Sequence, residues 1–152
     1  MPRLKVVAHK KTGQLFKGYA ELPVSVDPSP LSSHAPVHLP KSITITPEIG
    51  GRATNIALDS LKALFFVRSF DGDAAYNEIK FFNPEPKIEG LWVHLTFEDG
   101  EMTEGIIHNG LGFILEQGFL LKPPDPHSNN QALYVLKAAL KEFRVVGVKA
   151  SY

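Results

Sequence analysis

The chain has 152 residues, a length that allows one ordinary domain or two very small ones. Hydrophobic residues make up 43% of the sequence, which is enough to build a core and excludes a globally disordered chain. The 16 basic residues balance the 16 acidic ones, and this argues against nucleic acid and anionic membranes as general partners, because polyanion binders carry a basic excess.

The chain contains no cysteine, which excludes disulfides, thiolate metal ligands and cysteine nucleophiles together. That composition fits a reducing compartment. The first residues, Met1 to Lys5, lack the apolar core of a signal peptide. No apolar stretch approaches the roughly 18 residues of a membrane-spanning helix, so we expect a cytoplasmic protein that does not insert into membranes.

The chain begins with a predicted hairpin. Residues 4–9 are rich in β-formers, Lys11-Thr12-Gly13 has the composition of a hairpin turn, and residues 14–21 form the expected return strand. Gly18 lies within that strand, where it permits a sharp bend without a Cβ clash. Residues 23–40 contain five prolines among serines and histidines, so we expect a long extended loop there.

The next segment predicts the end of a first unit. Clean alternation over residues 42–46 indicates a strand, and residues 52–58 are expected to form another. Asp59 to Lys62 has the pattern of a single helical or 3₁₀ turn with Asp59 as its cap. Residues 63–68 then form a hydrophobic closing strand, and residues 69–90 connect the first unit to a second one.

The second unit is expected to have the same order of strands and turns as the first. The strong hairpin signal Glu98-Asp99-Gly100 separates strands expected over residues 91–97 and 101–108. Later strands are predicted at residues 113–115, 118–122, 131–136 and 141–148, with a short turn at 137–140. A helix over residues 131–143 is the alternative, because alanine and leucine favour it, but the parallel with residues 56–67 argues against that helix.

One local pattern therefore occurs twice. In each copy an apolar run meets a polar turn with glycine, and another glycine follows five positions later, at Gly13 and Gly18 and again at Gly100 and Gly105. Five short, bent strands per copy predict an all-β fold made of two tandem SH3-like or Sm-like open barrels that arose by internal duplication. The expected boundaries are residues 1–68 and 91–152.

Five segments resemble one known family. They are Ala63–Val67, Tyr76–Glu78, Thr96–Glu101, Gly118–Pro126 and Ser128–Asn130. The family that they resemble is an uncharacterised bacterial domain of unknown function, often associated with PilZ-type signalling proteins. The resemblance covers most of the chain except residues 23–40, and it implies a bacterial cytoplasmic module that takes part in signalling or assembly.

The cyclic di-GMP site of PilZ domains does not carry over to this chain. Those domains bind the nucleotide through an Arg-x-x-x-Arg segment and a later Asp/Asn-x-Ser-x-x-Gly strand. Arg68 has no second arginine at the right offset, and Asp59-Ser60 lacks the spacer and the glycine.

The six histidines suggest a metal site, but their spacing argues against one. His34 and His38 flank Pro36, so no helix face can present them together. Zinc requires three or four convergent ligands. We therefore predict no metal site and no cofactor.

An acidic hairpin provides a first set of candidate residues, Glu98, Asp99, Glu101 and Glu104. Paired carboxylates can perform acid–base chemistry when they are buried and their pKa values are raised. These four surround a turn, so we expect them to be hydrated. They fit either a docking surface for a basic partner or a plain solvated hairpin.

A polar loop beside prolines provides a second set, Asp125, His127, Ser128, Asn129 and Asn130. One interpretation is a rigid recognition loop, because prolines lower the ordering cost of binding. The other is turn chemistry, in which Asp and Asn side chains cap nearby backbone groups. With Glu98, Asp99 and Glu101, these five are the predicted partner-binding residues.

No phosphate-cradling loop or nucleophile elbow is present. The aromatic residues are expected in the core, because the four arginines lie in no aromatic-basic motif. We therefore predict a non-enzymatic interaction module, an adaptor or accessory subunit that binds a protein partner in a bacterial complex. The alternatives are an Sm-like RNA or nucleotide binder, which the neutral charge weakens, and a small hydrolase or metalloenzyme.

Overall fold

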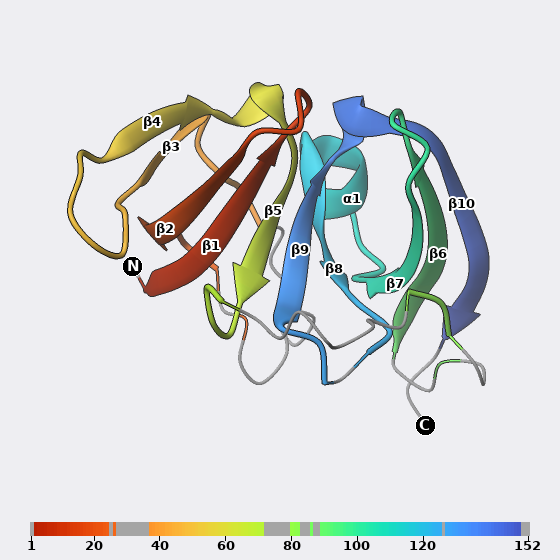
Figure 1. Cartoon of the computed structure of the whole chain (residues 1–152). Helices are drawn as coiled ribbons and strands as arrows, with labels where there is room; N and C mark the ends of the chain where they lie inside the picture. Colours follow the sequence, from red (N-terminus) through yellow and green to blue (C-terminus); the bar gives the residue numbers. More distant parts are fainter. Residues whose placement is uncertain are drawn as a thin grey trace.

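The computed structural model describes residues 2–24, 26, 37–71, 80–82, 86, 89–125 and 127–149. Two groups of strands lie side by side in it and meet at the strands β5 and β9 (Figure 1). Strands make up 54% of the described residues and helices 8%. The predicted all-β class is therefore confirmed.

The elements of the described residues fall into two successive sets. The first set consists of β1 (Arg3–Lys10), β2 (Leu15–Glu21), β3 (Ser42–Ile45), β4 (Thr54–Ala57), the 3₁₀ helix η1 (Leu58–Ser60) and β5 (Leu61–Val67). The second set consists of β6 (Gly90–Phe97), β7 (Met102–Ile107), α1 (Gly112–Leu115), β8 (Gly118–Lys122), β9 (Asn130–Leu136), the 3₁₀ helix η2 (Lys137–Ala139) and β10 (Leu140–Lys149). We refer to the two sets as the first half and the second half.

Eight of the strands form one antiparallel sheet in the order β10-β6-β7-β8-β9-β5-β1-β2. The strands β3 and β4 form a separate two-stranded sheet. It is tied to β2 by a bridge in which Tyr19 and Thr46 each donate a backbone N–H to the other's carbonyl, both at 2.8 Å. The pairing of β5 with β9, which sets Ala63 opposite Val135, joins the two halves into one sheet.

The first hairpin of each half turns at a glycine. Gly13 has a φ of 94° and Gly100 a φ of 91°, a region that residues with a Cβ rarely adopt. Each glycine donates its N–H back across the turn, to the carbonyl of Lys10 and of Phe97 respectively, both at 2.9 Å. The two predicted hairpin turns are therefore confirmed.

The tip of each hairpin rests on the 3₁₀ helix of its own half. The N–H of Lys11 donates to the carbonyl of Ser60 at 3.1 Å, and the N–H of Glu98 donates to the carbonyl of Ala139 at 2.9 Å. The closing strand that follows each helix carries one extra residue at the corresponding place, Lys62 in β5 and Lys141 in β10. Apart from α1, which occurs only in the second half, the two halves thus share the order of four strands, a 3₁₀ helix and a closing strand, and they share these local bonds.

Two hydrophobic clusters share β5 and β9, the strands at which the two halves are joined. The first cluster lies in the first half but includes Leu120, Ala132, Tyr134 and Leu136 from β8 and β9. The second cluster lies in the second half and takes in Phe65 from β5. Because successive side chains of a strand point to opposite faces, β5 and β9 contribute to both clusters, and the two halves stabilise each other.

The strand predicted at residues 113–115 is wrong, because these residues belong to the short helix α1. This turn of helix brings the Phe113 ring against Phe143, with ring centroids 4.7 Å apart, and against Phe119 at 5.6 Å. The helix considered as an alternative over residues 131–143 is not formed; most of these residues lie in β9 and β10.

The predicted cap at Asp59 is also wrong. The 3₁₀ helix η1 begins one residue earlier, at Leu58, and has no side-chain bond at its N-cap. Ser60 makes the local side-chain bond instead, donating its hydroxyl to the carbonyl of Ala57 at 2.6 Å. Asp59 falls inside the first turn of η1 and does not cap it.

Candidate functional site

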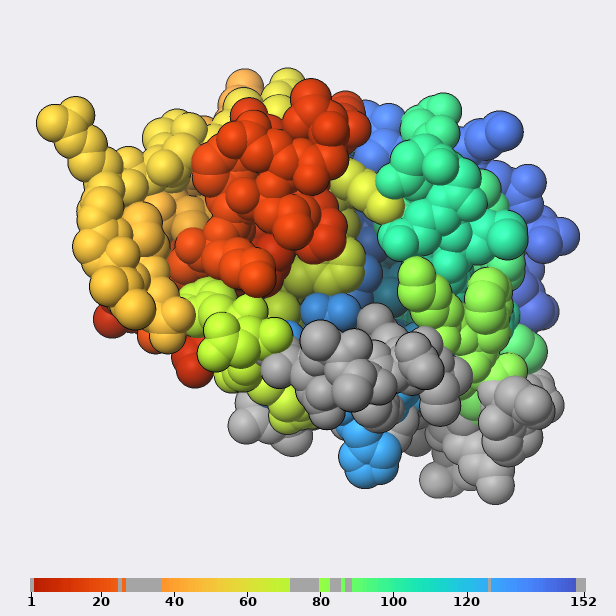
Figure 2. Space-filling view, in the orientation of Figure 1, coloured from red at the N-terminus to blue at the C-terminus, as the bar shows by residue number. Residues whose placement is uncertain are grey.

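A cleft of about 400 Å³ lies where the two halves meet. In Figure 2 it follows the furrow between the red surface of β1 and β2 and the green surface of the β6–β7 hairpin. Apolar side chains of the junction strands line it, among them Phe65 and Leu133, together with polar side chains from both halves. No single half could form this cleft, because each half supplies only part of the lining.

His9 of β1 lines one side of the cleft and packs against Phe65, which we describe together with Leu133 as the floor of the cleft. Its ring centroid is 4.1 Å from that of Phe65, with the planes tilted by 36°. Burial, followed by the positive charge of Lys62, lowers the pKa of His9 below its ordinary value of 6.5. The imidazole is therefore neutral at pH 7 and extends the aromatic surface of Phe65.

Two further side chains of the first hairpin, Leu15 and Lys17 of β2, line the cleft beside His9, and we call this part of the cleft its rim. Leu15 is 48% exposed and lines the cleft. Lys17 is exposed, and its ammonium donates to the backbone carbonyl of Phe70 at 3.3 Å. No carboxylate within the described ranges pairs with Lys17, so this rim offers an apolar side chain next to a positive charge.

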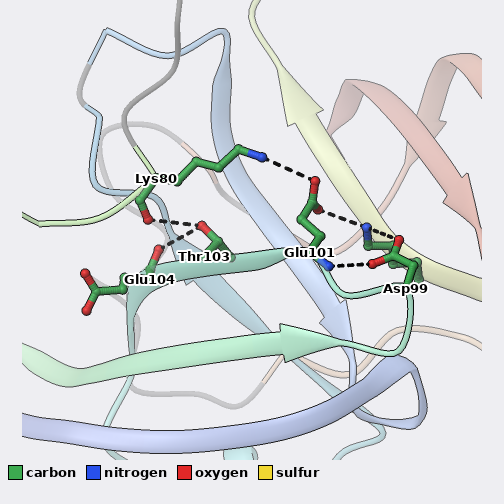
Figure 3. A network of polar contacts seen from close by, with 6 residues as sticks. Lys80, Asp99, Glu101, Thr103 and Glu104 are labelled. Carbon is green, nitrogen blue, oxygen red and sulfur yellow. Dashed lines mark hydrogen bonds and ion pairs between the residues drawn. The ribbon is translucent and has the colours of Figure 1, made fainter.

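A charged network forms the opposite side of the cleft. Lys62 of β5 donates to Asp99 at 2.7 Å and to Glu101 at 2.9 Å. Glu101 also accepts from Lys80 at 3.3 Å, and its own N–H donates to Asp99 at 2.9 Å (Figure 3). The Lys62 side chain is only 13% exposed and lies 4.5 Å above the centroid of the Phe97 ring. The network ties the first half to the hairpin of the second.

The charges of this network hold one another in the ionised state. Burial alone would lower the pKa of Lys62, but its hydrogen bonds to Asp99 and Glu101 outweigh burial and raise that pKa. The bond from Lys62 lowers the pKa of Asp99. Burial would raise the pKa of Glu101, yet Lys62 and Lys80 together lower it. At neutral pH Lys62, Asp99 and Glu101 are therefore charged, and their charges stabilise one another.

Replacing Lys62 with methionine is expected to lower the free energy of unfolding by about 1 kcal/mol, because two charge-assisted hydrogen bonds are lost while both carboxylates stay partly hydrated. Denaturant unfolding measures the change. The matched control is Lys141→Met, at the corresponding bulge of the second half, where the side chain is exposed. Equal effects of the two substitutions would contradict the role of the network.

Glu104, predicted to be hydrated, is instead 7% exposed. Its carboxylate accepts from the indole N–H of Trp92 at 2.8 Å and from the backbone N–H of Phe82 at 3.0 Å. Its backbone N–H donates to the carbonyl of Lys80 at 2.8 Å, which Thr103 also approaches at 3.3 Å (Figure 3). Glu104 is therefore a structural residue that fastens the connecting segment to β7.

The eight predicted partner-binding residues divide by position. Asp99 and Glu101 lie beside the cleft and are bound to Lys62, while Glu98 is exposed on the hairpin. Of the other five, Asp125, His127, Ser128 and Asn129 belong to the loop before β9, and Asn130 is the first residue of that strand. Of these, Asn129 and Asn130 line the end of the cleft.

The loop before β9 is held by its own side chains. Asp125 is 3% exposed, and its carboxylate accepts from the N–H of His127 at 2.9 Å. Ser128 is 2% exposed, and its hydroxyl accepts from the N–H of Asn130 at 2.9 Å. Both bonds join residues two apart, the geometry of side-chain turns.

Asn129 fastens this loop to the end of β5. Its side chain accepts from the N–H of Ser69 at 3.0 Å and donates to the carbonyl of the same residue at 2.9 Å. Arg68 donates its backbone N–H to the carbonyl of Asn129 at 2.9 Å and its Nε to that of Ser128 at 3.2 Å. The loop therefore gives the cleft a rigid end.

Sequence reasoning missed the residues that the structure brings together here, above all His9, Lys17, Lys62 and Phe65. One signal pointed to Lys62, since a Leu-Lys pair occurs in both closing segments, as Leu61-Lys62 and as Leu140-Lys141. No local sequence pattern indicates that β5 pairs with β9. Because this pairing creates the cleft, the cleft could not be predicted from the sequence.

Within the described part of the chain, no group of three His, Asp or Glu side chains is placed to hold a metal ion. Nor does any helix in those residues have the length and apolar character needed to cross a membrane.

Residues 2–147 match a family of unknown function, DUF6982. The chain belongs to this family. No curated protein and no solved structure matches the sequence. The resemblance to an uncharacterised family is thus confirmed by DUF6982, whereas the PilZ association and the bacterial origin stay predictions, because nothing links them to this family.

Proposed function

We propose that this DUF6982 protein is a non-enzymatic interaction module, in which two fused barrels of the SH3-like or Sm-like type hold a peptide segment of a protein partner in the cleft between them. The observation that carries the proposal is the cleft itself. Its lining comes from both halves, and hydrogen bonds fix it on two sides before any partner arrives.

The repeated bonds of the two halves support the two-barrel part of the proposal. In each half the first strand pairs with the second and with the last, as β1 does with β2 and β5, and β6 with β7 and β10. In each half a 3₁₀ helix precedes the closing strand and receives the hairpin tip. Such closure of five short strands is typical of small barrels.

The chemistry of the rim indicates the kind of segment that fits. Leu15 and the floor at Phe65 and Leu133 can bury an apolar side chain, which is favourable in proportion to the apolar area removed from water. Lys17, without a carboxylate partner within the described ranges, can pair with an acidic side chain. We therefore propose an extended segment that carries an acidic residue next to an apolar one.

The ionisation of the cleft residues disfavours catalysis. A general acid or base works best when its pKa lies near the operating pH. Here the pKa values of Asp99 and Glu101 are lowered by Lys62, and both carboxylates are held in ion pairs. The pKa of His9 is lowered by burial, and its ring is packed on Phe65.

The same pairing disfavours the Sm-like RNA binder. Single-stranded nucleic acid is bound along a groove of uncompensated positive charge with exposed aromatic rings. In this cleft Lys62 and Lys80 are already neutralised by Asp99 and Glu101. Lys17 alone does not make a basic track.

A peptide-display selection tests the proposal. We expect the wild-type chain to enrich short peptides with adjacent acidic and apolar residues. Binding of a synthetic enriched peptide, measured by fluorescence anisotropy, is expected to weaken at least about tenfold in Leu15→Glu and Lys17→Glu, since tenfold corresponds to about 1.4 kcal/mol. The control is Ile49→Glu, at a position that is 89% exposed in the β3–β4 turn.

Three outcomes would contradict the proposal. They are failure to enrich any peptide, equal loss of binding in Ile49→Glu, and preferential, strongly salt-dependent binding of a single-stranded oligonucleotide at the same cleft. The last outcome would favour the RNA binder instead.

A further inference from the structure

The chain pairs two kinds of strand edge at its internal junction, and within the described residues the same two kinds of edge have no strand beside them elsewhere in the fold. The junction joins β5, the closing strand of the first half, to β9, the strand before the 3₁₀ helix of the second half. The counterpart of β5 is β10, which forms the end of the eight-stranded sheet. The counterpart of β9 is β4, which among the described residues pairs only with β3.

The repeated features give the register that these open edges would share. The bulges at Lys62 and Lys141 make Arg144 of β10 equivalent to Phe65 of β5. The starts of the two 3₁₀ helices make Thr54 of β4 equivalent to Leu133 of β9. Since Phe65 lies opposite Leu133 in the junction, Arg144 of one copy would lie opposite Thr54 of another.

We propose that copies of this chain associate head to tail, with β10 of one copy antiparallel to β4 of the next in the register of the internal junction. The occupant of the β10 edge is thus a second copy of the chain. The same chain carries both edges, and its own junction shows that strands of these two kinds pair.

The exposed side chains of β10 suit such pairing. Val145, Val146 and Val148 are 49%, 47% and 65% exposed on this end strand, and an edge strand with apolar residues is a template for another strand. The charges beside them are partly compensated, because Arg144 donates to Glu142 at 2.9 Å. Lys141 and Lys149 leave the strand as a whole with a net positive charge.

The absence of cysteine from the chain makes a direct test available. Opposed residues of an antiparallel pair have Cα atoms about 4.5 to 5.5 Å apart, within the roughly 4.4 to 6.8 Å that a disulfide spans. Under mild oxidation, an equimolar mixture of Arg144→Cys and Thr54→Cys chains is expected to form the mixed disulfide several-fold faster than a mixture of Arg144→Cys and Ile49→Cys chains. Mass spectrometry identifies the linked pair.

Two results of this experiment would overturn the proposal. Equal rates in both mixtures would mean that contact between the edges is random. Predominant linkage of Arg144→Cys to itself would mean that β10 pairs with β10 of a second copy about a two-fold axis.

Light scattering of the wild-type chain provides the second measurement. Head-to-tail contacts leave one open edge at each end, so the average mass is expected to rise with concentration or to reach that of a closed ring. A double Val145→Lys, Val148→Lys variant, which places charges on the edge, is expected to remain at the mass of one chain. A wild type that stays at that mass at the concentration used for cross-linking would refute the proposal. Peptide binding in the cleft is expected to be unchanged in the variant, so failure here is distinct from failure of the proposed function.

Discussion

Replacing Ile43 with alanine is expected to lower the free energy of unfolding by about 2 to 5 kcal/mol, the range for truncating a buried isoleucine, and to destabilise both halves together. Ile43 lies in β3 and is 3% exposed. It belongs to the hydrophobic cluster that also contains Tyr134 and Leu136 of the second half. Loosening this cluster therefore removes support from β9, although β3 pairs only with strands of the first half in the described part of the chain.

Trp92 makes this coupling measurable. It is the only tryptophan of the chain, it lies in β6 of the second half, and its indole N–H is bonded to Glu104. Its fluorescence reports the unfolding of the second half, whereas far-UV circular dichroism reports all strands. In Ile43→Ala we expect the two denaturant transitions to coincide and to shift by the same amount.

A two-step transition in which the Trp92 signal keeps its wild-type midpoint would show that the halves unfold independently. The control is Ile49→Ala, where the side chain is 89% exposed. This substitution is expected to change the free energy of unfolding by no more than about 0.5 kcal/mol.

The elements that the sequence predicted well are those set by local chemistry. Alternation over residues 42–46 and the apolar runs at 118–122 and 131–136 correspond to β3, β8 and β9. The turns at Gly13 and Gly100 require a positive φ, and the glycines that satisfy this requirement can be recognised in the sequence. Signals of this kind span a few residues and depend little on the rest of the chain.

The local errors have an equally local cause. Residues 113–115 form a short apolar run, and such a run fits a strand or one turn of helix equally well. The packing of Phe113 against Phe119 and Phe143 decides between them. Phe143 lies in β10, far from residues 113–115 in the sequence, so its contact with Phe113 could not be predicted from this short apolar run.

The candidate site shows the same division. Asp99 and Glu101 could be identified as an acidic hairpin, but their principal partner could not, because Lys62 reaches them only through the pairing of β5 with β9. That pairing leaves no periodicity or turn signal. Likewise the burial of Glu104 depends on Trp92 and Phe82, which come from different segments.

Replacing Gly18 with alanine is expected to lower the free energy of unfolding by about 3 kcal/mol, through steric overlap and the loss of two backbone hydrogen bonds. A Cβ at Gly18 would overlap the backbone carbonyl of Thr46 and lie 2.8 Å from Cγ2 of Ile45. Because the obstacle includes backbone, it cannot move aside as a flexible side chain can. The next residue, Tyr19, makes both hydrogen bonds of the bridge to Thr46.

The matched control is Gly13→Ala, which separates conformational strain from steric overlap. Gly13 has a φ of 94°, but a Cβ there would meet no atom within 4 Å, so the expected loss is only about 1 kcal/mol. Hydrogen exchange at the Tyr19 and Thr46 amides then locates the damage. In Gly18→Ala both amides are expected to lose protection, because the bridge between them fastens the β3–β4 sheet to β2. Equal losses of stability in the two variants, or unchanged protection of these amides in Gly18→Ala, would mean that the close approach at Gly18 does not hold this sheet in place.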